Sequence, residues 1–290
     1  MPLRAPPSDR DVDALLSFGV VNLDKPPGPS AHQVAAWVRD MADLDRAAHA
    51  GTLDPKVTGC LPTLLGDATR AVPALQTAGK EYVAVLELHG AAPADFDAIV
   101  SEFVGDIYQK PPRKSAVARR LRVREIHDVE ILDREERRAL LRIDCESGTY
   151  VRKLCHDLGL ALGTGAHMGD LRRSAAGPFD DADLVTLHDF ADALAEYRER
   201  GDESWLRDVV SPAERALADL PSVTIARSAA EEVAEGAPVY APGVVEAPGV
   251  ERDRLVACYT PDGSAVCLGR LVGDPDAESG TVVDLERVLV

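Results

Sequence analysis

The chain has 290 residues, 46% of them apolar, and a formal net charge of −17. This length exceeds that of one ordinary domain and predicts about two domains, with enough chain to bury a core. No apolar run approaches the roughly 18 residues that cross a membrane, and the acidic start, residues 1–17, lacks the pattern of a signal peptide. We therefore expect a cytoplasmic protein without a membrane partner.

The cysteines argue against a disulfide framework. There are five, and no two of them form a C-x-x-C pair: Cys60, Cys145, Cys155, Cys258 and Cys267. An odd, scattered set in a cytoplasmic chain predicts reduced and mostly buried thiols, and neither disulfides nor a zinc site. We expect no bound metal.

The charge bears on nucleic-acid binding in two ways. An acidic chain is a poor partner for RNA, because phosphate contacts depend on Lys and Arg. However, lysine occurs six times and asparagine once, at Asn22, and this acid-rich, lysine-poor composition suggests a halophile. In molar salt the Debye length is about 3 Å, so net repulsion from RNA is screened.

One stretch is strongly basic, although the chain as a whole is acidic. Residues 110–124 contain no acid and seven cations. A charge run is usually a solvated face, but in so acidic a chain it also indicates a nucleic-acid contact. The candidate RNA-binding residues in this stretch are Lys110, Arg113, Lys114, Arg119 and Arg120.

The first elements follow a Pro-rich, acidic tail at residues 1–17. Residues 18–23 are an apolar run that predicts a strand, and the prolines and glycine of residues 24–29 predict a loop. Ser30 can cap a helix with Val34, Trp37, Val38 and Met41 at helical spacing. We expect Trp37 to lie in the core.

The stretch from His49 to Pro62 has the densest set of chemically useful residues. Asp54 precedes a proline, which disfavours the α region and predicts an extended loop conformation. Gly51 and Gly59 permit turns or close backbone approach. An Asp on such a loop, five residues after a His, is a candidate nucleophile or general base, although an Asp that only caps a turn fits the local sequence as well.

The middle of the chain alternates strands and helices. Residues 81–89 alternate as a strand with Tyr82 on its apolar face, and residues 95–104 read as a helix. Residues 129–132 and 140–145 predict a hairpin. A helix opens at residues 148–152, and another covers residues 184–195. The order of Gly159, Gly163 and Gly165 does not fit a dinucleotide-binding loop.

From Ser211 the pattern of the sequence changes. A helix is expected at residues 213–220, and short apolar runs broken by Pro and Gly follow it. Residues 254–259 and 265–272 flank Pro261-Asp262-Gly263, which predicts a hairpin. Residues 211–290 therefore suggest a small β-barrel.

Five ordered motifs resemble the TruB family of pseudouridine synthases, and in particular its dyskerin-type branch of archaea and eukaryotes. They are Val21-Asn22-Leu23-Asp24-Lys25-Pro26-x-Gly28-Pro29-Ser30, His49-Ala50-Gly51-Thr52-Leu53-Asp54-Pro55-x-x-x-Gly59, Gly79-Lys80-Glu81-Tyr82-Val83, Gly148-Thr149-Tyr150-Val151-Arg152 and Gly165-Ala166-His167-Met168-x-x-Leu171-Arg172-Arg173. The resemblance implies an α+β fold: a mixed, mostly antiparallel sheet with flanking helices at 18–210, then a PUA-like β-barrel that binds RNA at 211–290. It also implies that residues 1–17 pack on this second domain.

The resemblance assigns roles to individual residues. Asp54 would be catalytic, with Arg152 pairing to it, and a neighbouring cation favours the ionised form that a carboxylate nucleophile needs. The residues implied to hold the base or its strand are Tyr82, Arg152, Tyr150, Leu171, His49 and Lys25. Each also has an ordinary interpretation, such as a core leucine or a surface lysine.

The implied reaction isomerises uridine to pseudouridine in RNA without a cofactor. The implied substrate is either the TΨC-loop uridine of tRNA or ribosomal RNA selected by an H/ACA guide RNA with small protein subunits. Two other readings stay open at this point. One is an RNA-binding scaffold of the same fold without activity, and the other is an acidic protein-interaction module, which would leave residues 110–124 unexplained.

Overall fold

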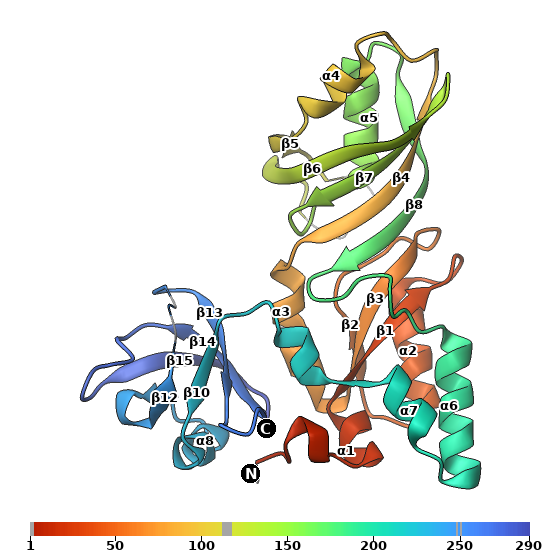
Figure 1. Cartoon of the computed structure of the whole chain (residues 1–290). Helices are drawn as coiled ribbons and strands as arrows, with labels where there is room; N and C mark the ends of the chain where they lie inside the picture. Colours follow the sequence, from red (N-terminus) through yellow and green to blue (C-terminus); the bar gives the residue numbers. More distant parts are fainter. Residues whose placement is uncertain (1–2, 112–117, 248, 250) are drawn as a thin grey trace.

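The computed structural model describes residues 3–111, 118–247, 249 and 251–290, and within them the chain forms two sheets (Figure 1). The larger sheet has nine strands in the order β5-β6-β7-β4-β8-β3-β1-β9, with β2 paired to β3. The pairings are antiparallel except for that of β3 with β8. The strands are β1 (Gly19–Lys25), β2 (Ala47–His49), β3 (Thr58–Leu65), β4 (Lys80–Leu88), β5 (Gly105–Gln109), β6 (Arg122–Arg134), β7 (Arg138–Cys145), β8 (Ala166–Ala176) and β9 (Ser211–Pro212).

Helices flank this sheet along its length. In Figure 1, α4 and α5 lie beside the half formed by β4 to β8, and α2, α6 and α7 lie beside the half that contains β1 and β3. A single apolar cluster runs through both halves. The helices of the larger part are α1 (Val12–Ser17), α2 (Ala31–Met41), α3 (Val72–Thr77), α4 (Phe96–Ser101), α5 (Val151–Ala161), α6 (Leu187–Arg200) and α7 (Ser204–Val209).

Helix α2 forms as predicted, but one of its residues is placed differently. The Ser30 hydroxyl accepts a hydrogen bond from the Gln33 amide and caps the helix. The prediction of Trp37 in the core is wrong, since 40% of its surface is exposed. The buried stripe consists of Ala31, Val34, Ala35 and Val38, and Trp37 lies at the edge of that stripe, where a large ring remains half in solvent.

Several predicted boundaries also change. Asp24 and Lys25, expected in a loop, belong to β1, and the strand predicted at 129–132 is the long β6. The expected helix at 95–104 shortens to α4. The helix expected from residue 184 begins at Leu187, because Thr186 and Asp189 form a capping box there.

The smaller sheet has six strands in the order β11-β15-β14-β13-β10-β12 and curls into a near-barrel around its own apolar core. The hairpin predicted around Pro261-Asp262-Gly263 is confirmed as β13 and β14. The expected helix at 213–220 is a short 3-10 turn, Ala213–Leu217. The elements are β10 (Ser222–Ile225), α8 (Arg227–Ala234), β11 (Val239–Tyr240), β12 (Val244–Glu246), β13 (Leu255–Tyr259), β14 (Ala265–Leu271) and β15 (Thr281–Val288). An α+β chain with a mostly antiparallel sheet and a smaller β domain is therefore confirmed.

The N-terminal segment joins the two parts. Arg10 is 2% exposed and donates two hydrogen bonds, of 2.8 and 2.6 Å, to the Glu214 carboxylate. The same carboxylate accepts from the Ala265 amide of β14 at 3.0 Å. Arg4 donates to the Leu289 carbonyl at 3.2 Å, so the two chain ends lie close together.

All five cysteines are buried and unpaired, as predicted. Burial raises the pKa of Cys60, Cys145 and Cys155 to about 12, so these thiols stay protonated. In the described part of the chain no group of three or more His, Cys, Asp or Glu is arranged to hold a metal ion. No helix in the same residues is long and apolar enough to cross a membrane.

Candidate active site

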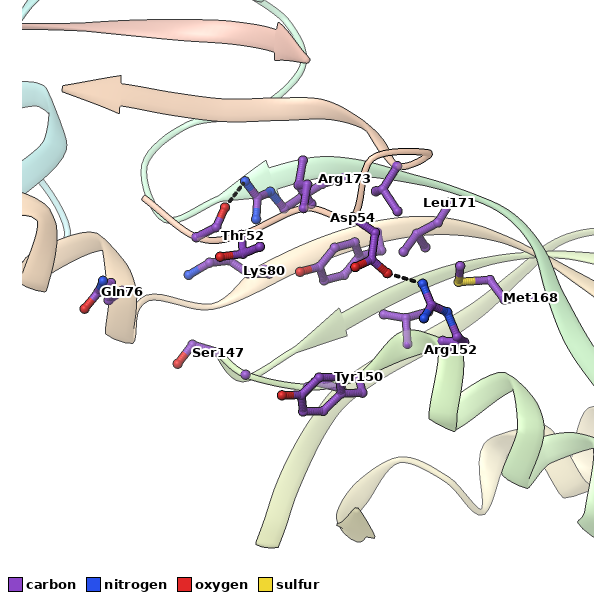
Figure 2. A pocket seen from close by; sticks show the side chains of 17 residues that line it. Thr52, Asp54, Gln76, Lys80, Ser147, Tyr150, Arg152, Met168, Leu171 and Arg173 are labelled. Atoms are coloured by element: carbon purple, nitrogen blue, oxygen red, sulfur yellow. Dashed lines mark hydrogen bonds and ion pairs between the residues drawn. The ribbon is translucent and has the colours of Figure 1, made fainter. Parts of the chain in front are cut away.

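A cavity of about 530 Å³ lies where four segments meet: the Asp54 loop, β4, the turn before α5, and β8. Figure 2 shows the Asp54 carboxylate directed into this cavity, with Arg152 and Met168 at one end and Gln76 and Ser147 at the other. The segments are distant in sequence, and the sheet brings them together because β4 and β8 are neighbouring strands.

The Asp54 loop is held from below by Lys25. The Lys25 ammonium is fully buried and donates to the carbonyls of Pro26, Pro55 and Val57 at 2.9, 3.1 and 2.9 Å. Burial lowers the pKa of Lys25, and the charge of Asp54 opposes that shift. Lys25 thus lies beneath the loop and is not part of the cavity wall, so its contribution is to fix the loop that carries Asp54.

Glycine is required where this loop returns to the sheet. Gly59 has a φ of +98°, and a Cβ atom there would lie 2.2 Å from the Arg173 carbonyl oxygen. An L side chain would therefore push β3 away from β8 at the base of the loop. This clash explains why the motif has a glycine at position 59.

Asp54 and Arg152 form an ion pair across 98 residues of sequence. The Arg152 Nη2 donates to the Asp54 Oδ2. Arg152 is the second residue of α5 and points out of its first turn toward the loop. Both side chains are about half exposed. The carboxylate is thus accessible from solution and lies directly beside a guanidinium.

Tyr82 and Leu171 form apolar walls of the cavity. They lie on adjacent strands, where Tyr82 pairs with Arg173 and Ala84 pairs with Leu171. Burial raises the pKa of Tyr82, so its phenol stays neutral. An aromatic ring beside an aliphatic side chain provides the kind of surface on which a flat base stacks.

Tyr150 also lines the cavity, and its backbone is fixed by a residue that sequence reasoning missed. The Tyr150 amide donates to Gln109 Oε1 at 2.9 Å, and Gln109 Nε2 donates to the Tyr150 carbonyl at 3.2 Å. Gln109 is 1% exposed and ends β5. It therefore anchors the start of α5, which carries Tyr150 and Arg152. No local pattern marks this contact, because 41 residues separate the partners.

His49 lies behind the loop and not on the cavity wall. Its Nε2 is 3.3 Å from His32 Nδ1, and the two rings meet edge to face at 4.6 Å. Burial, followed by His32 and Arg173, lowers the pKa of His49 to about 4. The imidazole therefore stays neutral near pH 7. His32, on α2, was also missed by sequence reasoning.

The lowered pKa of His49 predicts a pH-dependent stability. Between the ordinary value of 6.5 and about 4, the unfolded chain binds a proton at His49 that the folded chain does not. The free energy of unfolding therefore falls as pH falls through this window. We expect His49→Gln to remove roughly 2 kcal/mol of that loss. Each pKa unit contributes at most about 1.36 kcal/mol to the free energy of unfolding, and the partial exposure of His49 reduces this contribution. Urea unfolding at fixed salt, near pH 7 and near pH 4.5, measures it. Equal losses in both proteins would contradict the assignment.

The basic stretch starts directly after Gln109. Lys110, Arg119 and Arg120 are exposed, and the Arg119 Nε donates to the Pro111 carbonyl at 3.1 Å. Arg113 and Lys114 lie outside the described residues. Arg124, at the end of the stretch, pairs with Glu146. Among the described residues, then, at least three cations of this stretch face solvent.

Comparison with known proteins identifies the family. Models described as the TruB family N-terminal domain, the tRNA pseudouridylate synthase B C-terminal domain, the DKCLD domain and the PUA domain match residues 39–95, 152–218, 2–35 and 221–289. A probable tRNA pseudouridine synthase B of Haloarcula marismortui is 66% identical over all of this chain and 94% of its own length. This chain belongs to the TruB family.

The solved structures agree with this membership. The protein in a Cbf5-Nop10-Gar1 complex superposes with a TM-score of 0.95 at 45% identity, covering 99% of this chain and 90% of that one. A chain of an H/ACA ribonucleoprotein bound to a substrate RNA containing 2′-deoxyuridine gives 0.92 at 43% identity, over 99% and 90%. The TruB-family resemblance predicted from the five motifs is confirmed, and so is the identification as a pseudouridine synthase. The match to a haloarchaeal relative agrees with the acid-rich composition.

Within this TruB-family chain, the structure brings five of the seven predicted site residues to one cavity. Asp54, Tyr82, Tyr150, Arg152 and Leu171 line it. Lys25 lies beneath the Asp54 loop, and His49 contacts His32 away from the cavity wall. Sequence reasoning did not single out Lys80 and Arg173, which also line the cavity, because no local pattern distinguishes a buried cation from an exposed one.

Proposed function

We propose that this protein isomerises uridine to pseudouridine in RNA, with Asp54 as the catalytic residue. The observation that carries this proposal is the Asp54–Arg152 pair at a cavity walled by Tyr82 and Leu171. The cavity places a carboxylate, paired with a guanidinium, beside a surface for a flat ring. An RNA-binding scaffold without activity would have no chemical need for this combination.

The chemistry follows from the geometry. The target uridine leaves its stack, because its reactive atoms are otherwise covered by neighbouring bases. The bond between C1′ and N1 breaks, the base turns against Tyr82, and C5 bonds to C1′ before its proton departs. Asp54 acts at the sugar, at the base or on the C2′ proton, and in each case it must be ionised. Leu171 and Tyr150 confine the turning base.

Two RNA substrates are supported by different observations. The Haloarcula marismortui relative is named as a probable tRNA pseudouridine synthase B, which supports the TΨC-loop uridine of tRNA. One superposed structure is a complex of Cbf5 with Nop10 and Gar1, and the other is an H/ACA ribonucleoprotein bound to a substrate RNA. Each match covers 99% of this chain and so includes the smaller sheet. We infer that the chain also works as the catalytic subunit of a guide-directed particle that modifies ribosomal RNA, in the cytoplasm.

An assay on two RNAs separates these routes. The purified protein is given unmodified tRNA or a ribosomal RNA fragment, with and without a matching guide RNA and the small subunits. We expect pseudouridine in tRNA from the protein alone, and in the fragment only when guide and subunits are present. Binding of both RNAs without isomerisation under any condition would leave only the scaffold function.

We propose that the cations of residues 110–124 contact RNA phosphates. Lys110, Arg119 and Arg120 are exposed, and Arg113 and Lys114 lie outside the described residues. Each phosphate contact on single-stranded RNA contributes roughly −0.7 to the slope of log affinity against log salt. Replacing Arg119 and Arg120 by Ala should therefore make the slope shallower by roughly 1.4. Arg200→Ala, an exposed change on α6, is the control. An unchanged slope in the double variant would exclude these two contacts.

A further inference from the structure

Two buried cations form part of the cavity wall. Lys80 is 5% exposed and Arg173 is 1% exposed. The Lys80 ammonium donates to the carbonyls of Leu75, at 3.0 Å, and Ala78. The Arg173 guanidinium donates to the carbonyls of Cys60, at 2.7 Å, and Gly51, at 3.3 Å.

Neither cation has a carboxylate partner among the described residues. Their hydrogen bonds are with backbone carbonyls and, for Arg173, also with the Tyr82 hydroxyl. The charges that act on Lys80 are those of Arg173, Cys145 and Cys60. A buried charge without a counter-ion is costly, and it is usually paired or neutralised. In a chain with 49 acidic residues, two such cations beside one cavity suggest that the opposite charge comes from outside.

The sheet register places both cations beside the aromatic wall. Lys80 and Tyr82 are two residues apart on β4 and therefore share a face. Arg173 is directly opposite Tyr82 on β8, and its charge acts on the Tyr82 hydroxyl. Figure 2 shows Lys80, Arg173 and Thr52 on one side of Asp54 and Arg152 on the other.

Gly51 keeps these cations close to the cavity. It has a φ of +115°, and a Cβ atom there would lie 3.2 Å from Arg173 Nη1 and 3.7 Å from Lys80 Cε. Gly51 is itself a cavity residue. The absence of a side chain leaves little between the two cations and whatever occupies the cavity.

We propose that Lys80 and Arg173 stabilise the negative charge that develops on the uracil ring when it separates from the ribose. This inference rests on the proposed function. When the C1′–N1 bond breaks, its electron pair remains on the base and spreads over N1, O2 and O4. The pair is then returned from C5 to C1′, a proton leaves C5, and a proton is taken up at N1. The product is an isomer, so no other reactant is needed. Fixed cations that are themselves buried act strongly on such a transient charge.

The protonation of Lys80 makes the inference testable. Burial first, and then Arg173, lowers the pKa of Lys80 to about 8. The ammonium therefore loses its proton as pH rises through about 8, and the charge that stabilises the base is lost. The groups that face Lys80 from neighbouring strands do not titrate there. Cys60 and Cys145 have a pKa of about 12, and burial raises that of Tyr82.

The experiment compares Lys80→Met and Lys80→Arg with the unchanged protein in single-turnover isomerisation at saturating RNA, from about pH 6 to about pH 9. We expect the unchanged protein to slow above about pH 8, and Lys80→Arg to hold its rate there, because a guanidinium stays charged. Lys80→Met should be slower by about 100-fold at neutral pH, with RNA affinity changed by less than about threefold. Lys153→Met, which removes a lysine outside the cavity wall, is the control.

The outcomes are distinct. A Lys80→Met rate within about threefold of the unchanged protein would overturn the inference. If that variant does not fold, as judged by its thermal melt, the pH profiles decide, and identical profiles for Lys80→Arg and the unchanged protein would overturn it. Absence of isomerisation by the unchanged protein, in contrast, would be a failure of the proposed function.

Discussion

Replacing Asp54 by Asn is expected to abolish isomerisation, a loss of at least about 10⁴-fold, while RNA affinity stays within a few-fold. Asparagine has nearly the same shape and still accepts a hydrogen bond from Arg152, so the loop should keep its structure. It carries no negative charge and can neither attack nor remove a proton. Pseudouridine formation in a saturating single turnover measures the loss, and filter binding measures the affinity.

A matched control for Asp54→Asn is Asp24→Asn. Asp24 also pairs with an arginine, since Arg172 donates to it at 2.9 and 3.0 Å, but it does not line the cavity. We expect this variant to retain most of its rate. If Asp54→Asn turned over at a rate comparable to that of the unchanged protein, the catalytic assignment would be removed.

Arg152→Met is expected to have the next largest effect, a fall of about 100-fold in the isomerisation rate. Methionine keeps much of the length of the side chain but removes the cation beside Asp54. The carboxylate then loses both its electrostatic partner and the contact that orients it. Lysine should restore only part of the rate, because a single ammonium does not reproduce the planar guanidinium fork.

The control for Arg152 is Arg207→Met, which removes an arginine of α7 that pairs with Glu203, the residue before that helix. This pair is about as exposed as that of Arg152 with Asp54. A loss in rate confined to Arg152→Met would assign the effect to the cavity. Equal losses in both variants would show that the effect arises from general destabilisation.

The local sequence predicted the elements that depend on local chemistry. The cap at Ser30, the hairpin around Asp262 and the alternation of β4 follow from side chains within a few residues of each other. The position of Asp54 in a loop, outside any helix, agrees with the proline that follows it. Boundaries shifted where a cap or a strand partner further along the chain decided them, as at Thr186 and in β6.

The contacts that assemble the site could not be predicted from local sequence. Arg152 and Asp54 are 98 residues apart, and only the family resemblance brought them together. The Gln109–Tyr150 bonds and the His32–His49 contact depend on sheet order and on the position of α2. Trp37 showed that helical spacing alone does not define the width of a buried stripe.

The burial of a charged residue could not be predicted from the sequence either. Nothing in the local sequence marks the following three cations as buried, and the structure shows that each is almost completely buried: Lys25, Lys80 and Arg173. One supports the Asp54 loop, and the other two face the cavity. The distinction comes from the register of β4 with β8 and from the path of the loop.

The most direct test of the account is a crystal structure of the Asp54→Asn variant bound to RNA that contains an unmodified target uridine. We predict that the uridine is turned out of its strand, with its ring between Tyr82 and Leu171 and its ribose C1′ beside residue 54. A target base that remains stacked in the RNA, or that binds away from this cavity, would contradict the account.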